Sequence, residues 1–206
     1  KEIDSVLEKV FSEIELNALK WLADYYLLPI GQVLFMALPN KFKSIIKYKT
    51  DAKCSFEFKN IKKAPELTSE QEKIFQSIIS SSKGFHVSVI HGITGSGKTR
   101  IYVELIKEIL KKNSSALLLI PEIGLCHQVY KELTNFIDEP IALITSELTE
   151  KQHYVSHKLI SEGHYKIVIG TRMAVFSQLH DLGLIIIDEE HDPSFKQQDG
   201  LRYNAR

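Results

Sequence analysis

From position 68 onward, hydrophobic residues occur in two kinds of segment that alternate along the chain. One kind is a short apolar run with the length of a buried strand, and we predict strands at 85–90, 116–120, 141–145, 166–169 and 184–187. The other kind has apolar residues at intervals of three and four, which predicts helices at 74–79, 101–110, 123–136 and 150–160. Alternating strands and helices form a mostly parallel sheet with helices on both faces, so we predict a three-layer α/β domain.

The first 67 residues do not follow this alternation. Helical spacing is visible at 3–11 and 16–28, a proline and a glycine interrupt it, and 32–38 fits another short helix. A small helical element packed on the main domain and a helical linker explain this pattern equally well. Residues 41–63 then combine eight lysines with four aromatic and only two acidic residues. That composition is typical of a nucleic-acid-facing surface, but also of a solvated strand.

A glycine-rich segment stands between the first predicted strand and the helix at 101–110. It reads Gly-Ile-Thr-Gly-Ser-Gly-Lys-Thr and fits the phosphate-binding pattern G-x-x-x-x-G-K-[ST]. Its glycines let the backbone approach an anion, and N–H groups of the loop and the helix N-terminus bind phosphates. The lysine is expected on the β- and γ-phosphates and the last threonine on Mg²⁺. We therefore predict a site for ATP and Mg²⁺ formed by Gly92, Thr94, Gly95, Ser96, Gly97, Lys98, Thr99 and Arg100.

Four polar residues, Asp188, Glu189, Glu190 and His191, directly follow the last apolar run. That run is typical of a central parallel strand, whose carboxyl end would lie beside the phosphate loop. We predict that Asp188 binds Mg²⁺ and that Glu189 orients the water that attacks the γ-phosphate. The second acid indicates hydrolysis, because a phosphate-transfer enzyme that excludes water does not need it. Within this catalytic group, His191 is predicted to link the nucleotide to another surface, although such histidines are more often packed polar residues.

Further polar residues mark candidate contacts around these motifs. Gln71 lies in the first turn of a helix that Thr68 or Ser69 can cap, and its amide has the donor and acceptor that an adenine edge requires. Two strand ends carry groups suited to phosphodiester contacts, although ordinary turns have the same composition. The last segment interleaves aromatic rings with amides and cations, which suits both a nucleic-acid-binding loop and a solvated one. The candidate nucleic-acid contacts are Pro121, Glu122, Thr171, Arg172, Phe195, Lys196, Gln197, Gln198, Arg202 and Tyr203.

Composition limits the function without naming it. The chain has 206 residues and a formal net charge of zero, so its global charge does not indicate a nucleic-acid partner. Its two cysteines, Cys54 and Cys126, have no metal-ligand spacing, which favours a reducing, cytoplasmic location. No apolar run long enough to span a bilayer and no signal peptide is visible, so no membrane partner is expected. Both ends of the sequence look cut, and we expect a fragment of a longer protein.

The chain resembles the PriA family, superfamily 2 DNA helicases that restart stalled bacterial replication forks. Five motifs carry the resemblance: the loop at 92–99, Pro121-Glu-Ile-Gly-Leu, Ile167-Val-Ile-Gly-Thr-Arg, Asp188-Glu-Glu-His and Phe195-Lys-Gln-Gln-Asp-Gly-Leu-Arg-Tyr. The resemblance implies the first RecA-like P-loop lobe of an ATP-dependent 3′-to-5′ DNA helicase. It implies single-stranded and forked DNA, primosome proteins and single-strand-binding proteins as partners. It also assigns Gln71 to an adenine-sensing motif and residues 195–203 to a loop that senses single-stranded DNA.

The resemblance also divides the chain. Residues 1–40 would be the helical end of an N-terminal DNA-binding region, 41–66 a basic linker or strand, and 67–206 the ATP-binding lobe 1. The family's cysteine-bound zinc lies in its second lobe, so no zinc is expected here. That lobe would also supply the arginine finger, so the chain alone is expected to bind nucleotide weakly and hydrolyse it poorly. The family's winged-helix domain has no visible counterpart, and Met173 stands where a serine is common.

Two other functions stay open from the sequence. The basic stretch and the aromatic loop also suit a DNA-structure-binding module that recruits primosome proteins, with ATP hydrolysis peripheral. A P-loop kinase or transporter ATPase is disfavoured by the Asp-Glu-Glu-His motif and by the lack of a lid or signature segment in the sequence.

Overall fold

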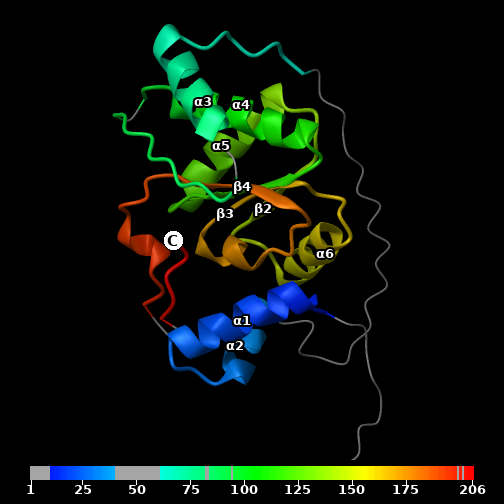
Figure 1. The fold of residues 1–206 in the computed structure, drawn as a ribbon. Coiled ribbons are helices and arrows are strands. Elements are labelled where there is room, and N and C mark those ends of the chain that lie inside the picture. Colours follow the sequence, from blue (N-terminus) through cyan, green and yellow to red (C-terminus); the bar gives the residue numbers. More distant parts are fainter. Residues whose placement is uncertain (1–9, 40–60, 82–83, 94, 199, 201) are drawn as a thin grey trace, which may run out of the picture.

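The computed structural model describes residues 10–39, 61–81, 84–93, 95–198, 200 and 202–206. Most of the lysine-rich stretch, and Thr94 of the phosphate loop, lie outside the described residues. The centre is a four-stranded sheet formed by β1 (Ser115–Leu119), β2 (Ile141–Ile144), β3 (Ile167–Gly170) and β4 (Leu182–Ile187). Its strands pair in parallel in the order β2-β3-β1-β4 (Figure 1).

Helices cover both faces of this sheet. On one side lie α3 (Ser69–Ser81), α4 (Lys98–Lys111) and α5 (Ile123–Phe136), and on the other lie α6 (Glu150–Ser161) and the 3₁₀ helix η2 (Arg172–Phe176) (Figure 1). Successive residues of β1 serve opposite faces, because side chains alternate along a strand. Leu118 packs with α4 and α5, whereas Leu117 packs with α6 and η2. The sheet thus divides the core into two layers, which confirms the predicted three-layer α/β fold.

The first predicted strand is not formed. Residues 85–90 have no regular secondary structure, and Phe85, Val87 and Val89 are 95%, 69% and 89% exposed. A strand needs a hydrogen-bonded neighbour as well as a favourable sequence, and this segment is not part of the described sheet. β4 consequently lies at the edge of that sheet and not at its centre, with Ile185 53% exposed. Two sequence predictions were therefore wrong: the strand at 85–90 and the central position of β4.

Two helices near the N-terminus form a small helical unit on the α6 side of the sheet (Figure 1). α1 (Glu13–Tyr25) begins with a reciprocal capping box between Ser12 and Glu15, and α2 (Ile30–Ala37) packs against α1. The unit's own core contacts Phe176 of η2 and consists of Leu19, Ala23, Val33 and Ala37. Of the two interpretations of this region, the packed helical element is therefore the one observed.

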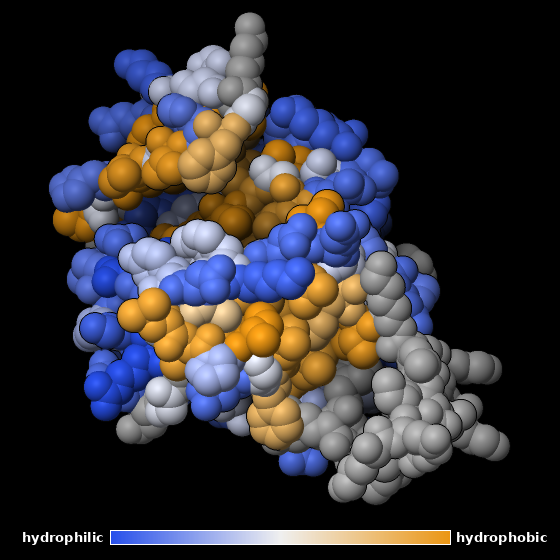
Figure 2. All heavy atoms as spheres, turned by 60° about the horizontal axis from the view of Figure 1, so that its bottom comes forward, coloured by the Kyte–Doolittle hydropathy of each residue, from blue (hydrophilic) through white to orange (hydrophobic). Residues whose placement is uncertain are grey.

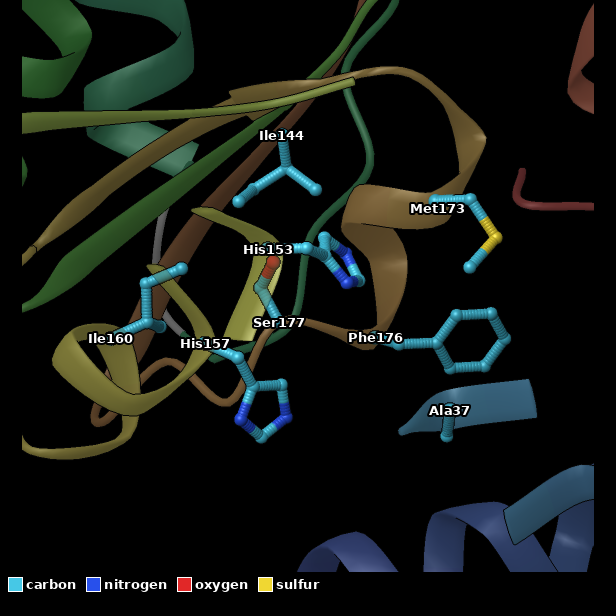
Figure 3. A pocket seen from close by; sticks show the side chains of 8 residues that line it. All are labelled: Ala37, Ile144, His153, His157, Ile160, Met173, Phe176 and Ser177. Carbon is cyan, nitrogen blue, oxygen red and sulfur yellow. The ribbon is translucent and has the colours of Figure 1, made fainter. Parts of the chain in front are cut away.

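The junction between the helical unit and the sheet domain contains hydrogen bonds as well as apolar contacts. The buried amide of Gln178 donates to the carbonyl oxygen of Val10 at 2.7 Å and to Oε2 of Glu15 at 3.2 Å. A pocket of about 20 Å³, room for about one water molecule, remains between α2, α6 and η2 (Figure 3). His157 lines this pocket and is buried, and burial followed by the nearby His153 lowers its pKa to about 4.

The outer face of the helical unit is apolar. Figure 2, which turns this side toward the viewer, shows apolar side chains gathered over it. The exposed large side chains of α1, α2 and the turn between them are Ile14, Trp21, Tyr25, Leu27, Ile30 and Phe35. None of the helices described is long and apolar enough to cross a membrane.

Candidate nucleotide-binding site and nucleic-acid interface

The phosphate loop turns sharply into α4. Gly95 and Gly97 have φ angles of 81° and 79°, in the left-handed region that favours glycine, and Gly97 is the N-cap of the helix. A Cβ on Gly97 would lie 2.5 Å from Nε2 of Gln71, so a larger residue would also force this side-chain amide to move. The N–H groups at the start of α4, which bind anions in loops of this kind, thus follow directly on the turn.

Lys98 is held between the phosphate loop and the acidic motif, by which we mean Asp188, Glu189 and Glu190. Its Nζ donates to the carbonyl oxygen of Gly92 at 3.1 Å and to Oε1 of Glu189 at 3.2 Å. The two side chains of this ion pair are 18% and 31% exposed, so solvent only partly screens their attraction. A phosphate that reaches the loop has to share Lys98 with Glu189 or replace that partner. Phosphate binding and the position of Glu189 are therefore linked.

Asp188 follows β4 directly and is held by a tyrosine. Its N–H donates to the carbonyl oxygen of Leu119 at 2.9 Å, and its Oδ1 accepts from the hydroxyl of Tyr102 at 3.0 Å. Tyr102 is buried in the core layer that contains α4 and α5. Burial, and then the charge of Asp188, raise the pKa of Tyr102, so the phenol stays protonated and remains a donor. Because Tyr102 lies one helical turn after Lys98, one face of α4 contacts both acidic residues.

Glu189 has a φ of 47°, a left-handed conformation that residues other than glycine rarely adopt. Backbone strain of this kind is concentrated at functional sites. The imidazole of His191 is 80% exposed, and its Nε2 lies 3.9 Å from Oε2 of Glu189. The structure thus brings Lys98, Asp188 and Glu189 together and leaves His191 at the rim of the site.

Thr99 and Asp188 were predicted to hold Mg²⁺. Both supply oxygen atoms, which this hard cation prefers, and Mg²⁺ at nucleotide sites takes few protein ligands because phosphates and water complete its shell. Among the described residues, no three or more His, Cys, Asp or Glu side chains are grouped to hold a metal. A threonine hydroxyl and an aspartate carboxylate are ligand types that suit a Mg²⁺ whose remaining ligands are phosphate and water. The hydroxyl of Tyr102 donates to Oδ1 of Asp188, and this hydrogen bond would help to orient a carboxylate that binds Mg²⁺.

A pocket of about 370 Å³ lies between α3, α4 and the segment before α3. Arg100 spans it, with Nε donating to the carbonyl oxygen of Pro65 at 2.7 Å and Nη1 donating to Oε1 of Glu104 at 2.6 Å. The lining combines apolar and charged residues: Ala64, Pro65, Glu66, Leu67, Glu72, Phe75, Arg100 and Glu104. Four of these eight residues are apolar and four are charged, so only part of the lining has the apolar character usual for a small-molecule site.

Gln71 lies between the capping residue of α3 and the phosphate loop. Its Oε1 accepts from the N–H of Thr68 at 3.0 Å, and its Nε2 lies 3.4 Å from the carbonyl oxygens of Ser96 and Gly97. The amide therefore already has partners on both sides. A contact with adenine, as predicted, requires Gln71 to exchange one of the longer of these bonds.

One serine joins three of the segments predicted to contact DNA. Nη1 of Arg172, at the end of β3, donates to the carbonyl oxygen of Ser194 at 2.8 Å, and Oγ of Ser194 donates to the carbonyl oxygen of Pro121 at 3.3 Å. Glu122 is exposed and Thr171 is half-buried beside them. The residues that follow β1, β3 and β4 thus form one surface at the carboxyl edge of the sheet, where ligands of such sheets bind.

The aromatic residues of the last segment are not at the surface. Phe195 is 0% and Tyr203 1% exposed, and both pack in the core layer that contains α6. Tyr203 makes an edge contact with Phe176, with ring centroids 5.2 Å apart. The prediction that these rings stack on bases is therefore corrected, because in this arrangement they anchor the segment to the core. Four of the predicted contacts remain accessible to a nucleic acid, half-buried in the case of Gln197: Lys196, Gln197, Gln198 and Arg202.

Sequence reasoning missed Tyr102 and Ser194 and gave Arg206 only a general cationic role. Nη1 of Arg206 donates to the carbonyl oxygen of Glu190 at 2.6 Å and to its Oε1 at 3.1 Å. For Tyr102 a signal existed, because it stands four residues after Lys98 on a predicted helix. No local signal marks the side-chain hydrogen bonds of the other two residues, since those partners are between 16 and 73 positions away in the sequence.

Comparison with known proteins identifies relatives of the chain. The family model for the Type III restriction enzyme, res subunit, matches residues 64–204. The model for the 3′ DNA-binding domain (3′BD) of PriA matches residues 1–39. The replication restart protein PriA of Rickettsia prowazekii is 38% identical over 196 residues, which cover 93% of this chain and 28% of that protein.

Proteins from two further bacteria give similar matches. PriA of Haemophilus influenzae is 44% identical over 140 residues, which cover 68% of this chain and 19% of that protein. PriA of Bacillus subtilis is 37% identical over 151 residues, which cover 72% of this chain and 19% of that protein. The chain thus spans less than a third of the length of these relatives.

Proposed function

Because the chain belongs to the PriA family of replication restart proteins, and residues 64–204 to the helicase-type res subunit family, we propose that it is the ATP-binding lobe of a 3′-to-5′ DNA helicase. The observation that carries the proposal is the convergence of three groups. Lys98 pairs with Glu189, and Tyr102 of the same helix holds Asp188. In this proposal Lys98 binds the phosphates, Thr99 and Asp188 hold Mg²⁺, and Glu189 directs the attacking water.

The adenine occupies the pocket of about 370 Å³ in this proposal. The pocket is close to the phosphate loop, because one of its lining residues, Arg100, lies in the first turn of α4 directly after that loop. Its apolar wall, which includes Phe75 and Leu67, suits a purine ring, and Gln71 stands between the pocket and the loop. The nucleotide would therefore lie across the start of α4, with its phosphates on the loop and its base against α3.

DNA follows the carboxyl edge of the sheet. The surface joined by Ser194 offers backbone groups and the guanidinium of Arg172, and the accessible cations Lys196 and Arg202 lie beyond it. The match of residues 1–39 to a 3′ DNA-binding domain supports a second contact through the helical unit. Replication restart at stalled forks, with primosome and single-strand-binding proteins as partners in the cytoplasm, completes the proposal.

Nucleotide binding and turnover by this chain, with and without a forked DNA, test the proposal. Wild type should bind Mg²⁺–ATP, and Lys98→Ala should lose that binding, because the phosphates lose their principal cation. Turnover should stay near background even with DNA, since an arginine finger from a second lobe is worth about 10³- to 10⁵-fold in rate in related systems. Equal nucleotide affinity of wild type and Lys98→Ala would contradict the proposed ATP site. Strong stimulation by DNA would show that one lobe suffices.

A second function is favoured by the match to the 3′ DNA-binding domain model. In that case the chain binds DNA structures and recruits primosome proteins, with ATP hydrolysis peripheral. Fork binding that survives both Lys98→Ala and Glu189→Gln, with no effect of nucleotide on the affinity for DNA, would favour this alternative over the motor.

A further inference from the structure

Residues 195–198 and 202–205 form two antiparallel arms between the helical unit and the acidic motif, and we call them the connector hairpin. The N–H of Gln197 donates to the carbonyl oxygen of Tyr203 at 2.9 Å, and the N–H of Ala205 donates to that of Phe195 at 3.1 Å. An antiparallel bridge between Lys196 and Asn204 lies between these bonds. The ladder fixes its two arms side by side, so a displacement of one arm moves the other.

A tyrosine of the helical unit binds one arm of this hairpin. The hydroxyl of Tyr26, the C-cap of α1, accepts from the N–H of Asn204 at 2.9 Å. The ring of Tyr26 packs against the core layer that holds Phe195 and Tyr203. Because a β-arm carries its N–H groups on both edges, Asn204 can serve the helical unit while its neighbours serve the ladder. Tyr26 thus contacts the connector hairpin through its hydroxyl and packs against the core layer that anchors the hairpin.

The same arm contacts the acidic motif two residues later. The N–H of Arg206 donates to Oδ1 of Asn204 at 3.2 Å, and Nη1 of Arg206 donates to Glu190. Glu190 adjoins Glu189, which pairs with Lys98 of the phosphate loop. A continuous series of contacts therefore runs from the helical unit, through residues 204–206, to the proposed phosphate site.

We propose that Tyr26 is a positioning residue that couples the helical unit to the nucleotide site through Asn204 and Arg206. The inference rests on the proposed function, in which the helical unit and the carboxyl edge bind DNA and the loop binds ATP. DNA on the helical unit fixes Tyr26, the Tyr26 contact fixes residues 204–206, and Arg206 then holds the acidic motif in place for the nucleotide. By reciprocity, nucleotide binding increases the affinity for DNA by the same factor.

The test is the ratio of the Kd values for a non-hydrolysable ATP analogue without and with a saturating single-stranded oligonucleotide, measured on this chain with Mg²⁺. Wild type should give a ratio above one. Tyr26→Phe removes one hydroxyl and keeps the ring, so the ratio should fall by roughly 2- to 10-fold, the value of one hydrogen bond. The affinity for nucleotide alone should change by less than about twofold, because Tyr26 is remote from the loop. A role confined to folding would lower the melting temperature and leave the ratio unchanged.

Tyr25→Phe is the matched control. Tyr25 is adjacent in sequence, and its residue is 66% exposed and stacked on Trp21, so the same chemical change should not alter the ratio. Arg206→Gln should lower the ratio by as much as Tyr26→Phe, and the double variant should lower it no further, because both residues act on one path. Additive losses would contradict a shared path.

Three results overturn the inference alone. The first is an unchanged ratio in Tyr26→Phe, and the second is unchanged hydrogen exchange at the amide of Asn204 in that variant, which would mean that the contact does not hold the arm. The third is a wild-type ratio of one although both ligands bind, which leaves the proposed function intact. Failure of the wild-type chain to bind either ligand overturns the proposed function, and this inference with it.

Discussion

Replacing Tyr102 by phenylalanine removes one hydroxyl from beneath the nucleotide site and leaves the ring in the core. The lost bond is a 3.0 Å contact with a carboxylate, and bonds to charged groups contribute about 1.5–3 kcal/mol. Asp188 is half-buried, so water can replace the hydroxyl, and we expect a loss near the lower limit. At 1.4 kcal/mol per tenfold, this is about a tenfold loss, within the roughly 10- to 100-fold range for residues that orient metal ligands. The loss should appear in the Mg²⁺-dependent part of nucleotide affinity.

The assay is a titration with a fluorescent nucleotide analogue at several concentrations of free Mg²⁺ and again with a chelator. Tyr102→Phe should require about tenfold more Mg²⁺ for half-maximal affinity, whereas its affinity in the chelator should equal that of wild type. Tyr130→Phe is a suitable control, because Tyr130 packs against the same core layer from α5. An unchanged Mg²⁺ dependence, or an equal loss with and without Mg²⁺, would refute the reasoning that Tyr102 positions Asp188 for the cation.

Three further predictions concern stability. Burial, and then the nearby His153, lower the pKa of His157 to about 4 in the fold, against about 6.5 in the unfolded chain, so the unfolded chain binds its proton first. Stability should fall by up to about 3 kcal/mol as the pH drops from about 6.5 to 4, and urea unfolding of His157→Leu should lack that fall. Gly170→Ala should destabilise by about 1–3 kcal/mol in the same assay, because its Cβ would meet the carbonyl oxygen of Ile144. Gly124→Ala, which meets nothing within 4 Å in the first turn of α5, should instead stabilise by about 0.4–1 kcal/mol, and a lower urea midpoint would contradict this.

The buried strands and their helices could be predicted because burial on both faces leaves a clear pattern. The helix expected at 123–136 is observed at Ile123–Phe136, and the strand expected at 116–120 is observed at Ser115–Leu119. The strand at 85–90 failed for the opposite reason. The sequence at 85–90 favours an extended backbone, but a strand also needs a neighbouring strand to pair with, and the local sequence does not specify that neighbour. For the same reason, the edge position of β4 could not be predicted from its sequence.

The candidate site was predictable where chemistry is local and unpredictable where it depends on packing. The phosphate loop and the Asp188–Glu189 pair are recognisable because glycine turns and paired acids have few other uses in those contexts. Aromatic residues among cations look alike in a stacking loop and in a buried anchor, so the burial of Phe195 and Tyr203 could not be read from composition. Contacts such as Tyr26 to Asn204 join residues 178 positions apart.

The edge position of β4 has a consequence for how the chain behaves in concentrated solution. Within the described sheet, β4 presents one unpaired row of backbone donors and acceptors, with Leu182 44% and Ile185 53% exposed. An apolar strand edge of this kind is a template for pairing with a second chain. The segment at 85–90 has no regular secondary structure and exposes Phe85, Val87 and Val89, so it is available for such pairing. Self-association through these segments would place residues next to the phosphate loop in an intermolecular sheet, so solubility and nucleotide affinity should decline together as concentration rises.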